Sequence, residues 1–258
     1  MLSRSQISAA LKSRLEPMEN IRAAWLGGSD ATGRADDLSD VDLCLIVSDG
    51  CIEAAADAVH TTLESLSPIS IHYRMPMPTW HGFHQAFYQL TDAPEYLMID
   101  WVIIEVSTKH PWLEVERHGT PKVLFDKDGR IKADHIDRAA TGPAVDRKVA
   151  HLRLKFPLFR HLPVKLAHRG LPVDAAHFYH NLVLRPLIDL LRCVYCPERW
   201  DFGPRYVRSD LPADAYAALS RLAYPSELQE MPRLVNEASA LFEQTLARWD
   251  REHPARSA

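Results

Sequence analysis

Residues 25–47, with the sequence WLGGSDATGRADDLSDVDLCLIV, constrain the fold of this chain more than any other stretch. Two apolar runs, residues 21–26 and 41–47, flank a turn that carries Gly28 and Ser29. A glycine leaves room for a backbone to approach a ligand, and Ser29 offers a hydroxyl and an amide at the mouth of the turn. The pattern predicts a strand, a tight turn, a short helix and a second strand, with a phosphate seat at the turn.

Asp40 and Asp42 stand where the second apolar run begins. Alternate side chains of a strand share a face, with Cβ atoms roughly 6.5 to 7 Å apart. Both carboxylates can therefore reach one divalent ion, or bridge two ions about 3.5 to 4 Å apart, which is the arrangement used for in-line displacement at phosphorus. Gly-Gly-Ser alone occurs in many turns, and Asp-x-Asp alone is often a solvated strand end. Together they predict a metal and phosphate site at one end of a sheet.

A third acidic residue, Asp100, stands in the apolar middle of the strand predicted for residues 95–106, EYLMIDWVIIEV. On the strand period it shares a face with Met98 and Val102, whereas Glu105 points to the other side. Burying an unpaired charge is costly, so the carboxylate must meet a metal, a cation or a hydrogen-bond network, or remain protonated. The alternative is an aspartate that is exposed on an edge strand or paired with an arginine.

The glycine-serine turn, its spacer, the letters DLSDVD and the apolar run behind them resemble the signature of the polymerase-β-type nucleotidyltransferase superfamily. The resemblance covers this motif and implies the chemistry more than the substrate. It implies Mg²⁺ or Mn²⁺ as the metal and ATP or another nucleoside triphosphate as the co-substrate. The roles that it implies are metal binding by Asp40 and Asp42, phosphate binding by Gly28 and Ser29, and a third metal ligand or a general base at Asp100.

The remaining pattern predicts an α/β domain, residues 1–131, in which helices flank a mixed sheet, and an α-helical domain, residues 132–258. The strands are expected within residues 21–26, 41–47, 69–73, 95–106 and 121–131. The helices are expected within residues 5–16, 52–66, 144–156, 173–196 (with a kink at Pro186), 213–223 and 226–251. The stretch MPMPTWHGFHQ, residues 75–85, is rich in proline and aromatics, so we expect a loop in which His81 and His84 are not metal ligands.

Composition and net charge argue against a membrane or a nucleic acid as a binding partner of this protein. The chain has 258 residues, 47% of them hydrophobic, and no apolar run approaches the roughly 20 residues that span a bilayer. The N-terminus lacks the apolar core and cleavage site of a signal peptide, so we expect a cytoplasmic protein without a membrane partner. The net charge of −4 argues against nucleic acid as a partner, because such proteins usually carry a basic surplus.

Residues 147–169 contain seven lysines and arginines and no acidic residue. A basic helix that faces an acidic metal site could hold a triphosphate. The alternative is a solvated face whose long side chains cover apolar surface.

We expect an enzyme that transfers a nucleoside monophosphate, AMP from ATP, to a hydroxyl of a small molecule and releases pyrophosphate. The pairing of such a domain with helices resembles the small bacterial aminoglycoside- and lincosamide-type nucleotidyltransferases. One alternative is AMP transfer to a protein acceptor. Another is a nucleotide-binding regulator that has lost turnover, although all three acidic positions are present.

Overall fold

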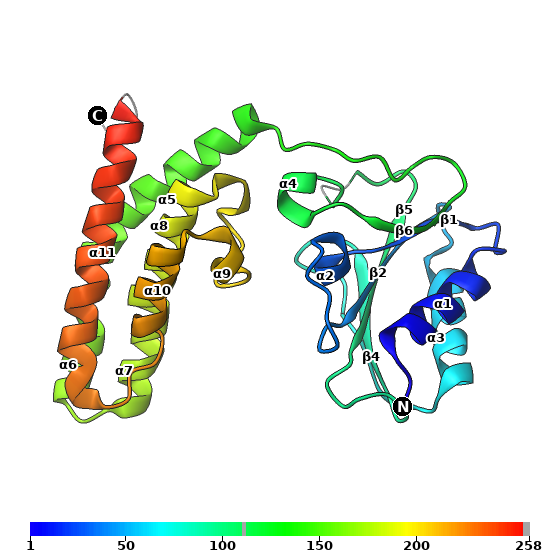
Figure 1. Cartoon of the computed structure of the whole chain (residues 1–258), viewed down its shortest axis with the longest axis horizontal. Coiled ribbons are helices and arrows are strands. Elements are labelled where there is room, and N and C mark those ends of the chain that lie inside the picture. Colours follow the sequence, from blue (N-terminus) through cyan, green and yellow to red (C-terminus); the bar gives the residue numbers. More distant parts are fainter. Residues whose placement is uncertain (110–111, 255–258) are drawn as a thin grey trace. The chain divides into compact units, whose positions relative to one another are not determined.

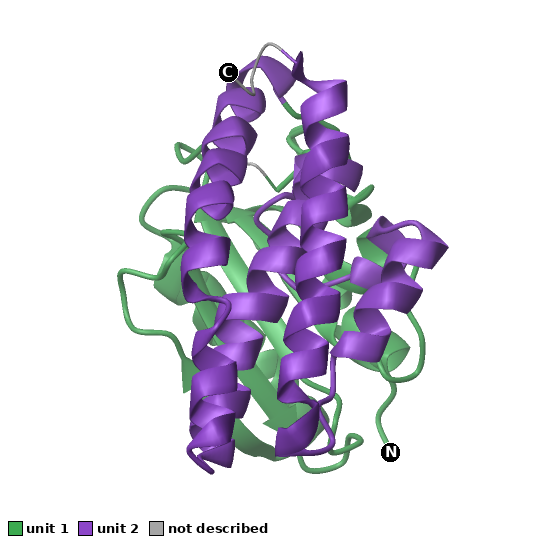
Figure 2. Ribbon diagram, turned by 90° about the vertical axis from the view of Figure 1, so that its left-hand side faces the viewer, with its two compact units in different colours: residues 1–136 green, residues 137–258 purple. Residues whose placement is uncertain are grey.

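The computed structural model describes residues 1–109 and 112–254. The chain forms two compact units, Met1–Ile136 and Asp137–Ala258, which Figure 2 distinguishes by colour. The first unit is a mixed six-stranded sheet with helices, and the second is helical, as the sequence predicts for the fold class. The division into an enzymatic domain of residues 1–131 and a helical domain of residues 132–258 stays a prediction.

The sheet of the first unit has the strand order β3-β4-β5-β2-β1-β6, and β2 and β5 are its parallel pair (Figure 1). Its strands are β1 (Ile21–Leu26), β2 (Val41–Val47), β3 (Ile69–Arg74), β4 (His84–Leu90), β5 (Ile99–Glu105) and β6 (Lys122–Asp126). The helices of this unit are α1 (Arg4–Leu15), α2 (Gly28–Ala31), α3 (Ile52–Leu66) and α4 (Val115–His118).

The two faces of the sheet are covered differently. On one face, α1 and α3 pack apolar residues such as Leu11 and Leu63 against alternate strand positions, including Leu43 and Trp101. Figure 1 shows both helices on this side of the sheet. The other face has a smaller apolar cluster, centred on residues such as Trp25, and it also receives the even-numbered positions of β2 and β5. This less covered face carries the candidate site.

Local pattern located most elements of the first unit. β1, β2 and α3 have the predicted bounds, and the turn before β2 contains the predicted short helix, α2. The prediction missed β4, because residues 75–85 were expected to form a loop and no strand was expected after them. Ala86, Phe87 and Tyr88 are three consecutive apolar residues, yet only Ala86 and Tyr88 are buried. Because these three residues are all apolar, the sequence lacks the alternation of apolar and polar residues by which a half-buried strand is recognised.

The second unit consists of helices around one apolar core. These elements are α5 (Arg138–Phe159), α6 (Leu162–His168), α7 (Pro172–Tyr179), the π-helix η1 (His180–Leu184), α8 (Arg185–Tyr195), the 3₁₀-helix η2 (Pro197–Arg199), α9 (Val207–Asp210), α10 (Ala213–Leu222), the 3₁₀-helix η3 (Leu228–Glu230) and α11 (Met231–Glu252). The stacked rings of Phe156 and Phe242, 3.9 Å apart, join α5 to α11 in that core. α6 was not predicted.

The helix predicted for residues 173–196 is interrupted just before the proline, where a kink was expected. A π-helical turn, η1, fills the gap between α7 and α8, and Pro186 is the second residue of α8. Proline has no backbone N–H and its ring crowds the preceding turn, so the regular hydrogen-bond ladder cannot continue through it. A wider π turn accommodates that missing donor.

Several residues of the basic segment have acidic partners within the second unit. Lys148 contacts Asp189 at 2.6 Å, and Arg160 contacts Glu243 at 3.2 Å. Arg153 pairs with Asp250, which raises the pKa of this arginine through a hydrogen bond and charge attraction. These ion pairs link α5 and the residue after it to α8 and α11 within the second unit.

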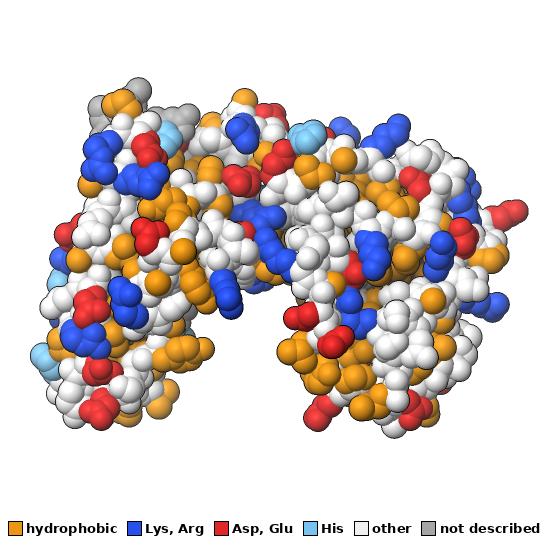
Figure 3. Space-filling view, viewed as in Figure 1, with side chains coloured by type: hydrophobic (Ala, Val, Ile, Leu, Met, Phe, Trp, Pro, Cys, Tyr) orange, Lys and Arg blue, Asp and Glu red, His pale blue; other side chains and the backbone are white. Residues whose placement is uncertain are grey.

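Exposed apolar side chains accompany acidic ones on the surface of the first unit (Figure 3). Its large exposed hydrophobic residues include Leu38, Ile71, Tyr73 and Tyr96. Within residues 1–109 and 112–254, every helix is too short or too polar to cross a membrane.

Candidate active site

One row of residues across the sheet defines the centre of the candidate site. Asp42 on β2 lies opposite Asp100 on β5, and the row continues through Phe87 on β4 to Tyr73 on β3. Register partners share a face, and neighbouring strands lie about 4.8 Å apart, so the two carboxylates start from adjacent backbone positions. Next to them, the rings of Phe87 and Tyr73 stack with centroids 6.2 Å apart. A carboxylate pair therefore adjoins an aromatic pair.

The turn after β1 packs directly on Asp42. Gly28 has φ +49°, and a Cβ atom built on it would lie 1.9 Å from Oδ2 of Asp42. Both the left-handed backbone and the close approach require glycine at this position. The backbone N–H of Ser29 donates to the Asp42 carboxylate. The turn that was predicted to seat phosphate therefore also holds Asp42.

The hydroxyl of Ser29 is a polar side-chain group of this turn that has no hydrogen-bond partner among the described residues. Its Oγ atom is buried. Buried polar atoms are nearly always paired in folded proteins, so an unpaired one next to a candidate site marks a place for a ligand atom or a water. The amide of Ser29 already donates to Asp42, so the hydroxyl is the polar group of Ser29 that could meet a ligand atom.

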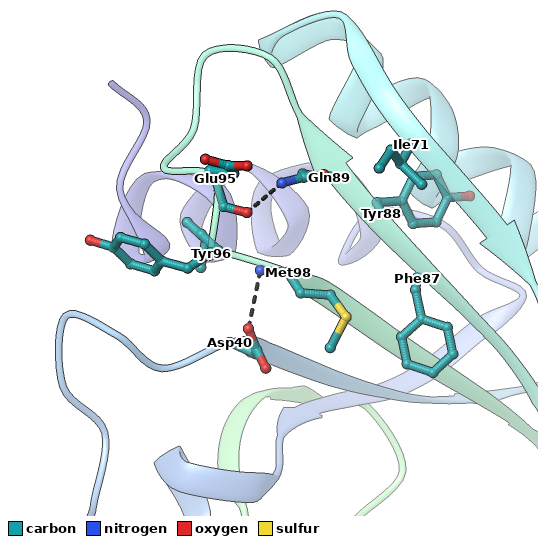
Figure 4. Close-up of a pocket in the computed structure, with 9 residues that line it drawn as sticks. Asp40, Ile71, Phe87, Tyr88, Gln89, Glu95, Tyr96 and Met98 are labelled. Carbon is teal, nitrogen blue, oxygen red and sulfur yellow. Dashed lines mark hydrogen bonds between the residues drawn. The ribbon is translucent and has the colours of Figure 1, made fainter. Parts of the chain in front are cut away.

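Asp40 joins the start of β2 to the strand beside it. Its Oδ1 accepts the backbone N–H of Met98 at 3.1 Å, as Figure 4 shows. Its own carbonyl oxygen accepts from the guanidinium of Arg4 at 2.8 and 3.1 Å. Asp40 thus keeps β2 and β5 in register close to Asp42 and Asp100, a structural use that the sequence did not predict.

Arg4 also connects α1 to the short helix after β1. Its Nη2 forms an ion pair with Asp30, whose side chain is 3% exposed, and Lys122 binds the other oxygen of Asp30 at 2.9 Å. Sequence reasoning missed all three residues. Each of them is an ordinary charged residue in a helix or strand, and only the fold brings them together.

Burial and like charges disfavour the ionised form of both central aspartates. Burial raises the pKa of Asp42, and the charges of Asp40 and Asp30 raise it further, against the hydrogen bond from Ser29. Burial raises the pKa of Asp100 to about 7; a hydrogen bond from Gln85 opposes this rise, and the charges of Asp42 and Asp40 add to it. A cation bound between the two carboxylates would offset this repulsion.

Asp100 meets a hydrogen-bond donor that the sequence analysis did not identify. The side-chain Nε2 of Gln85 lies 2.9 Å from each Asp100 oxygen. The Oε1 atom of Gln85 in turn lies 2.9 Å from Nε2 of His81. Asp100 therefore meets a hydrogen-bond network, which is one of the environments considered for a buried carboxylate. Gln85 was missed because β4 was missed.

A pocket of about 380 Å³ opens beside Asp40 (Figure 4). Phe87, Tyr96 and Met98 contribute apolar surface, and Glu95 contributes a second acidic residue. Its full lining is Asp40, Ile71, Phe87, Tyr88, Gln89, Glu95, Tyr96, Leu97 and Met98. Pockets of this size, mostly apolar with a few polar groups, are typical of sites that bind small organic molecules.

The predicted metal ligands are close in the fold but do not form a three-ligand cluster. Among the residues that the structure describes, no group of three or more His, Cys, Asp or Glu side chains is placed to hold a metal ion. Asp42 and Asp100 nevertheless provide adjacent carboxylates whose mutual repulsion a divalent cation would relieve. These donors are oxygen atoms, which Mg²⁺ prefers. The residues present therefore fit such an ion.

Comparisons with known proteins give distant structural matches. No protein-family model matches the chain, and no curated protein matches it significantly. An aminoglycoside 6-adenyltransferase from Bacillus subtilis is 15% identical, with 97% of this chain and 91% of that chain covered and a TM-score of 0.39. A nucleotidyltransferase-like protein from Exiguobacterium sibiricum is 14% identical, with 96% and 79% covered and a TM-score of 0.37.

A third match is the spectinomycin adenyltransferase from Enterococcus faecialis, whose structure holds ATP and spectinomycin. It is 11% identical, with 96% of this chain and 98% of that chain covered and a TM-score of 0.38. Over nearly its full length, the chain thus matches structures of aminoglycoside and spectinomycin adenyltransferases and of a nucleotidyltransferase-like protein, at low sequence identity.

Proposed function

We propose that the protein is a metal-dependent nucleotidyltransferase that moves AMP from ATP to a hydroxyl of a small molecule and releases pyrophosphate. The observation that carries the proposal is the pairing of Asp42 with Asp100 in adjacent strands, directly beside the Gly28 turn. The motif resemblance supplies the reaction class. The pocket beside Asp40 favours a small organic acceptor over a protein, because it has the size and lining of a small-molecule site.

Each residue has a proposed role in this transfer. Asp42 and Asp100 would hold Mg²⁺ or Mn²⁺, with Asp40 beside them as a further predicted ligand, and the ion would neutralise phosphate charge when bound. The Ser29 hydroxyl would donate to a phosphate oxygen, and Gly28 would let that phosphate approach the backbone. As the acceptor oxygen bonds to the α-phosphorus and the bond to pyrophosphate breaks, Asp100 would take the hydroxyl proton. A carboxylate within hydrogen-bond reach of the hydroxyl can act as this general base.

A screen with α-³²P-labelled ATP, GTP, CTP and UTP tests the proposal. Each nucleotide is incubated with Mg²⁺ and the protein, together with aminoglycosides, spectinomycin, other hydroxylated small molecules and cell-extract proteins. We expect label on a small molecule from ATP, with equimolar pyrophosphate. Label on a protein would show that the acceptor is a protein and not a small molecule. Nucleotide binding without any transfer would show that the protein is a nucleotide-binding regulator and not an enzyme.

We predict that Gly28→Ala loses the response to nucleotide. The methyl group would displace the Asp42 carboxylate, and the left-handed backbone costs about 1 to 2 kcal/mol for a residue with a side chain. Gly33→Ala is the matched control, because Gly33 has φ +68° and open space around its Cβ position. Both variants should lose stability without ligand in thermal melts, and Gly28→Ala should lose more because its methyl group also displaces Asp42. Stabilisation by Mg²⁺ and ATP should disappear only in Gly28→Ala, and an equal response in both variants would contradict the role of this turn.

We predict opposite stability changes for Asp42→Asn with and without ligand. In EDTA, the variant should melt at or above the wild-type temperature, because it relieves repulsion with Asp100 and Asp40 and keeps an oxygen for the Ser29 N–H. With Mg²⁺ and ATP at about a hundred times their dissociation constant, the wild type should gain about 2.7 kcal/mol, most of which the variant should lose. A variant that is weaker in EDTA but fully stabilised by Mg²⁺ and ATP would remove Asp42 from the metal site.

A further inference from the structure

A chain of hydrogen bonds leads from the loop before β4 to Asp100. Gln85 connects Asp100 to His81, and the Nδ1 atom of His81 accepts the backbone N–H of Phe83 at 3.1 Å. None of these contacts belongs to the strand ladder. His81 and Gln85 are half-buried and Phe83 is buried, so the chain lies largely inside the first unit.

The donors and acceptors at the two ends define the direction of this chain. A backbone N–H can only donate, so Nδ1 of His81 is the acceptor and the proton of the neutral ring stands on Nε2. Nε2–H then donates to Oε1 of Gln85, and the amide nitrogen of Gln85 donates to the carboxylate of Asp100. The His81 end sets the orientation of the Gln85 amide, and an ionised Asp100 carboxylate, which can only accept, requires the same orientation.

The loop holds the imidazole in this orientation. The Thr79 hydroxyl lies 3.3 Å from Nδ1 of His81 but donates its proton to the Phe83 carbonyl oxygen at 2.7 Å, so it leaves Nδ1 as an acceptor. The ring is flanked by Trp80 and Trp112 in edge contacts at 4.8 and 5.4 Å, and it stacks on Phe83 at 5.5 Å. Rotation of the imidazole would break the hydrogen bonds at both of its nitrogens.

We infer that His81 and Gln85 are positioning residues that orient the carboxylate of Asp100 for the reaction, with His81 acting through Gln85. This inference rests on the proposed function, in which Asp100 contacts the metal or the acceptor hydroxyl. Gln85 binds both Asp100 oxygens through one nitrogen, so it resists rotation of the carboxylate. Outer-shell partners of this kind typically change metal affinity or activity by about 10- to 100-fold when they are removed.

Two substitutions of the same histidine separate this role from a role in holding the loop. The amide of glutamine reaches the position of Nε2, so His81→Gln can still donate to Gln85. The amide of asparagine reaches only the position of Nδ1, so His81→Asn can still accept from Phe83 but leaves Gln85 without its donor. Gln85→Leu removes the link itself, and His84→Gln, on the same strand, controls for the loss of a nearby histidine.

Three measurements test the inference on the full-length protein. They are the ¹⁵N NMR shifts of His81, the dissociation constant of Mn²⁺ in the presence of ATP, and kcat and KM for pyrophosphate release. We expect an Nε2-protonated ring in the wild type. Mn²⁺ affinity and kcat should fall about 10- to 100-fold in His81→Asn and Gln85→Leu, while KM for ATP stays within a few-fold. His81→Gln and His84→Gln should stay close to the wild type.

Three results would overturn the inference. They are an Nδ1-protonated ring, a Gln85→Leu variant equal to the wild type, and a His81→Asn variant that is more active than His81→Gln, which would assign the histidine to the loop. Thermal melts confirm that each variant is folded. A wild-type protein that binds neither Mn²⁺ nor ATP would overturn the proposed function as well, whereas normal binding with unaffected variants would overturn this inference alone.

Discussion

Asp100→Asn is expected to lower the rate of AMP transfer by about 10² to 10⁴, the range that general-base catalysis usually contributes. Asparagine has nearly the same shape and can still bind Gln85, but it cannot take a proton and is a poorer metal ligand. ATP binding should stay within a few-fold of the wild type, because this role places Asp100 at the reacting oxygen. Single-turnover measurements with saturating Mg²⁺ and ATP would show the loss in the chemical step.

Glu105→Gln provides the matched control for Asp100→Asn. Glu105 lies on the same strand but faces the other side of the sheet, where its Oε1 accepts the backbone N–H of Gly50 at 2.7 Å. Glutamine keeps that acceptor, so this variant should turn over like the wild type. Near-normal transfer by Asp100→Asn would remove Asp100 from the mechanism and direct attention to Glu95, which lines the pocket beside Asp40.

Without metal, the free energy of unfolding of the protein is expected to fall as the pH rises towards 7, because Asp100 loses its proton. The pKa of Asp100 is raised to about 7 in the folded protein, chiefly by burial, against about 3.9 in an unfolded chain. The folded state therefore binds this proton more tightly. Protonation of Asp100 therefore adds to the free energy of unfolding. This contribution is fully present below about pH 4 and is lost as the pH rises to about 7. The loss is up to about 1.4 kcal/mol per pH unit and about 4 kcal/mol in total.

Urea denaturation of the wild type and Asp100→Asn in EDTA, between pH 4 and pH 8, would measure this loss. The asparagine variant lacks the titrating group, so its stability relative to the wild type should rise steadily from pH 4 to about pH 7 and then level off. Subtracting the free energies of unfolding of the two proteins at each pH cancels the contributions of most other titrating groups. A difference that stays constant over this range would show that Asp100 is not held in an environment that disfavours its charge.

The bounds of β1, β2 and α3 and the glycine-serine turn followed from the sequence alone. These features depend on neighbours within a few residues, where side-chain period and glycine chemistry act directly. The same period placed Asp100 on the side of β5 opposite Glu105. The assignment of Asp40, Asp42, Asp100, Gly28 and Ser29 to a metal and phosphate site stays a prediction.

Only the tertiary structure decided what surrounds these residues. The parallel pairing of β2 with β5 sets Asp42 opposite Asp100, and β4, which local pattern did not reveal, brings Gln85 to the same carboxylate. Arg4 reaches Asp40 from the first helix of the chain. Contacts between residues far apart in sequence depend on strand order and register, and the packing of the whole sheet sets these together. A polar residue such as Gln85 carries no local signal of the partner it will meet.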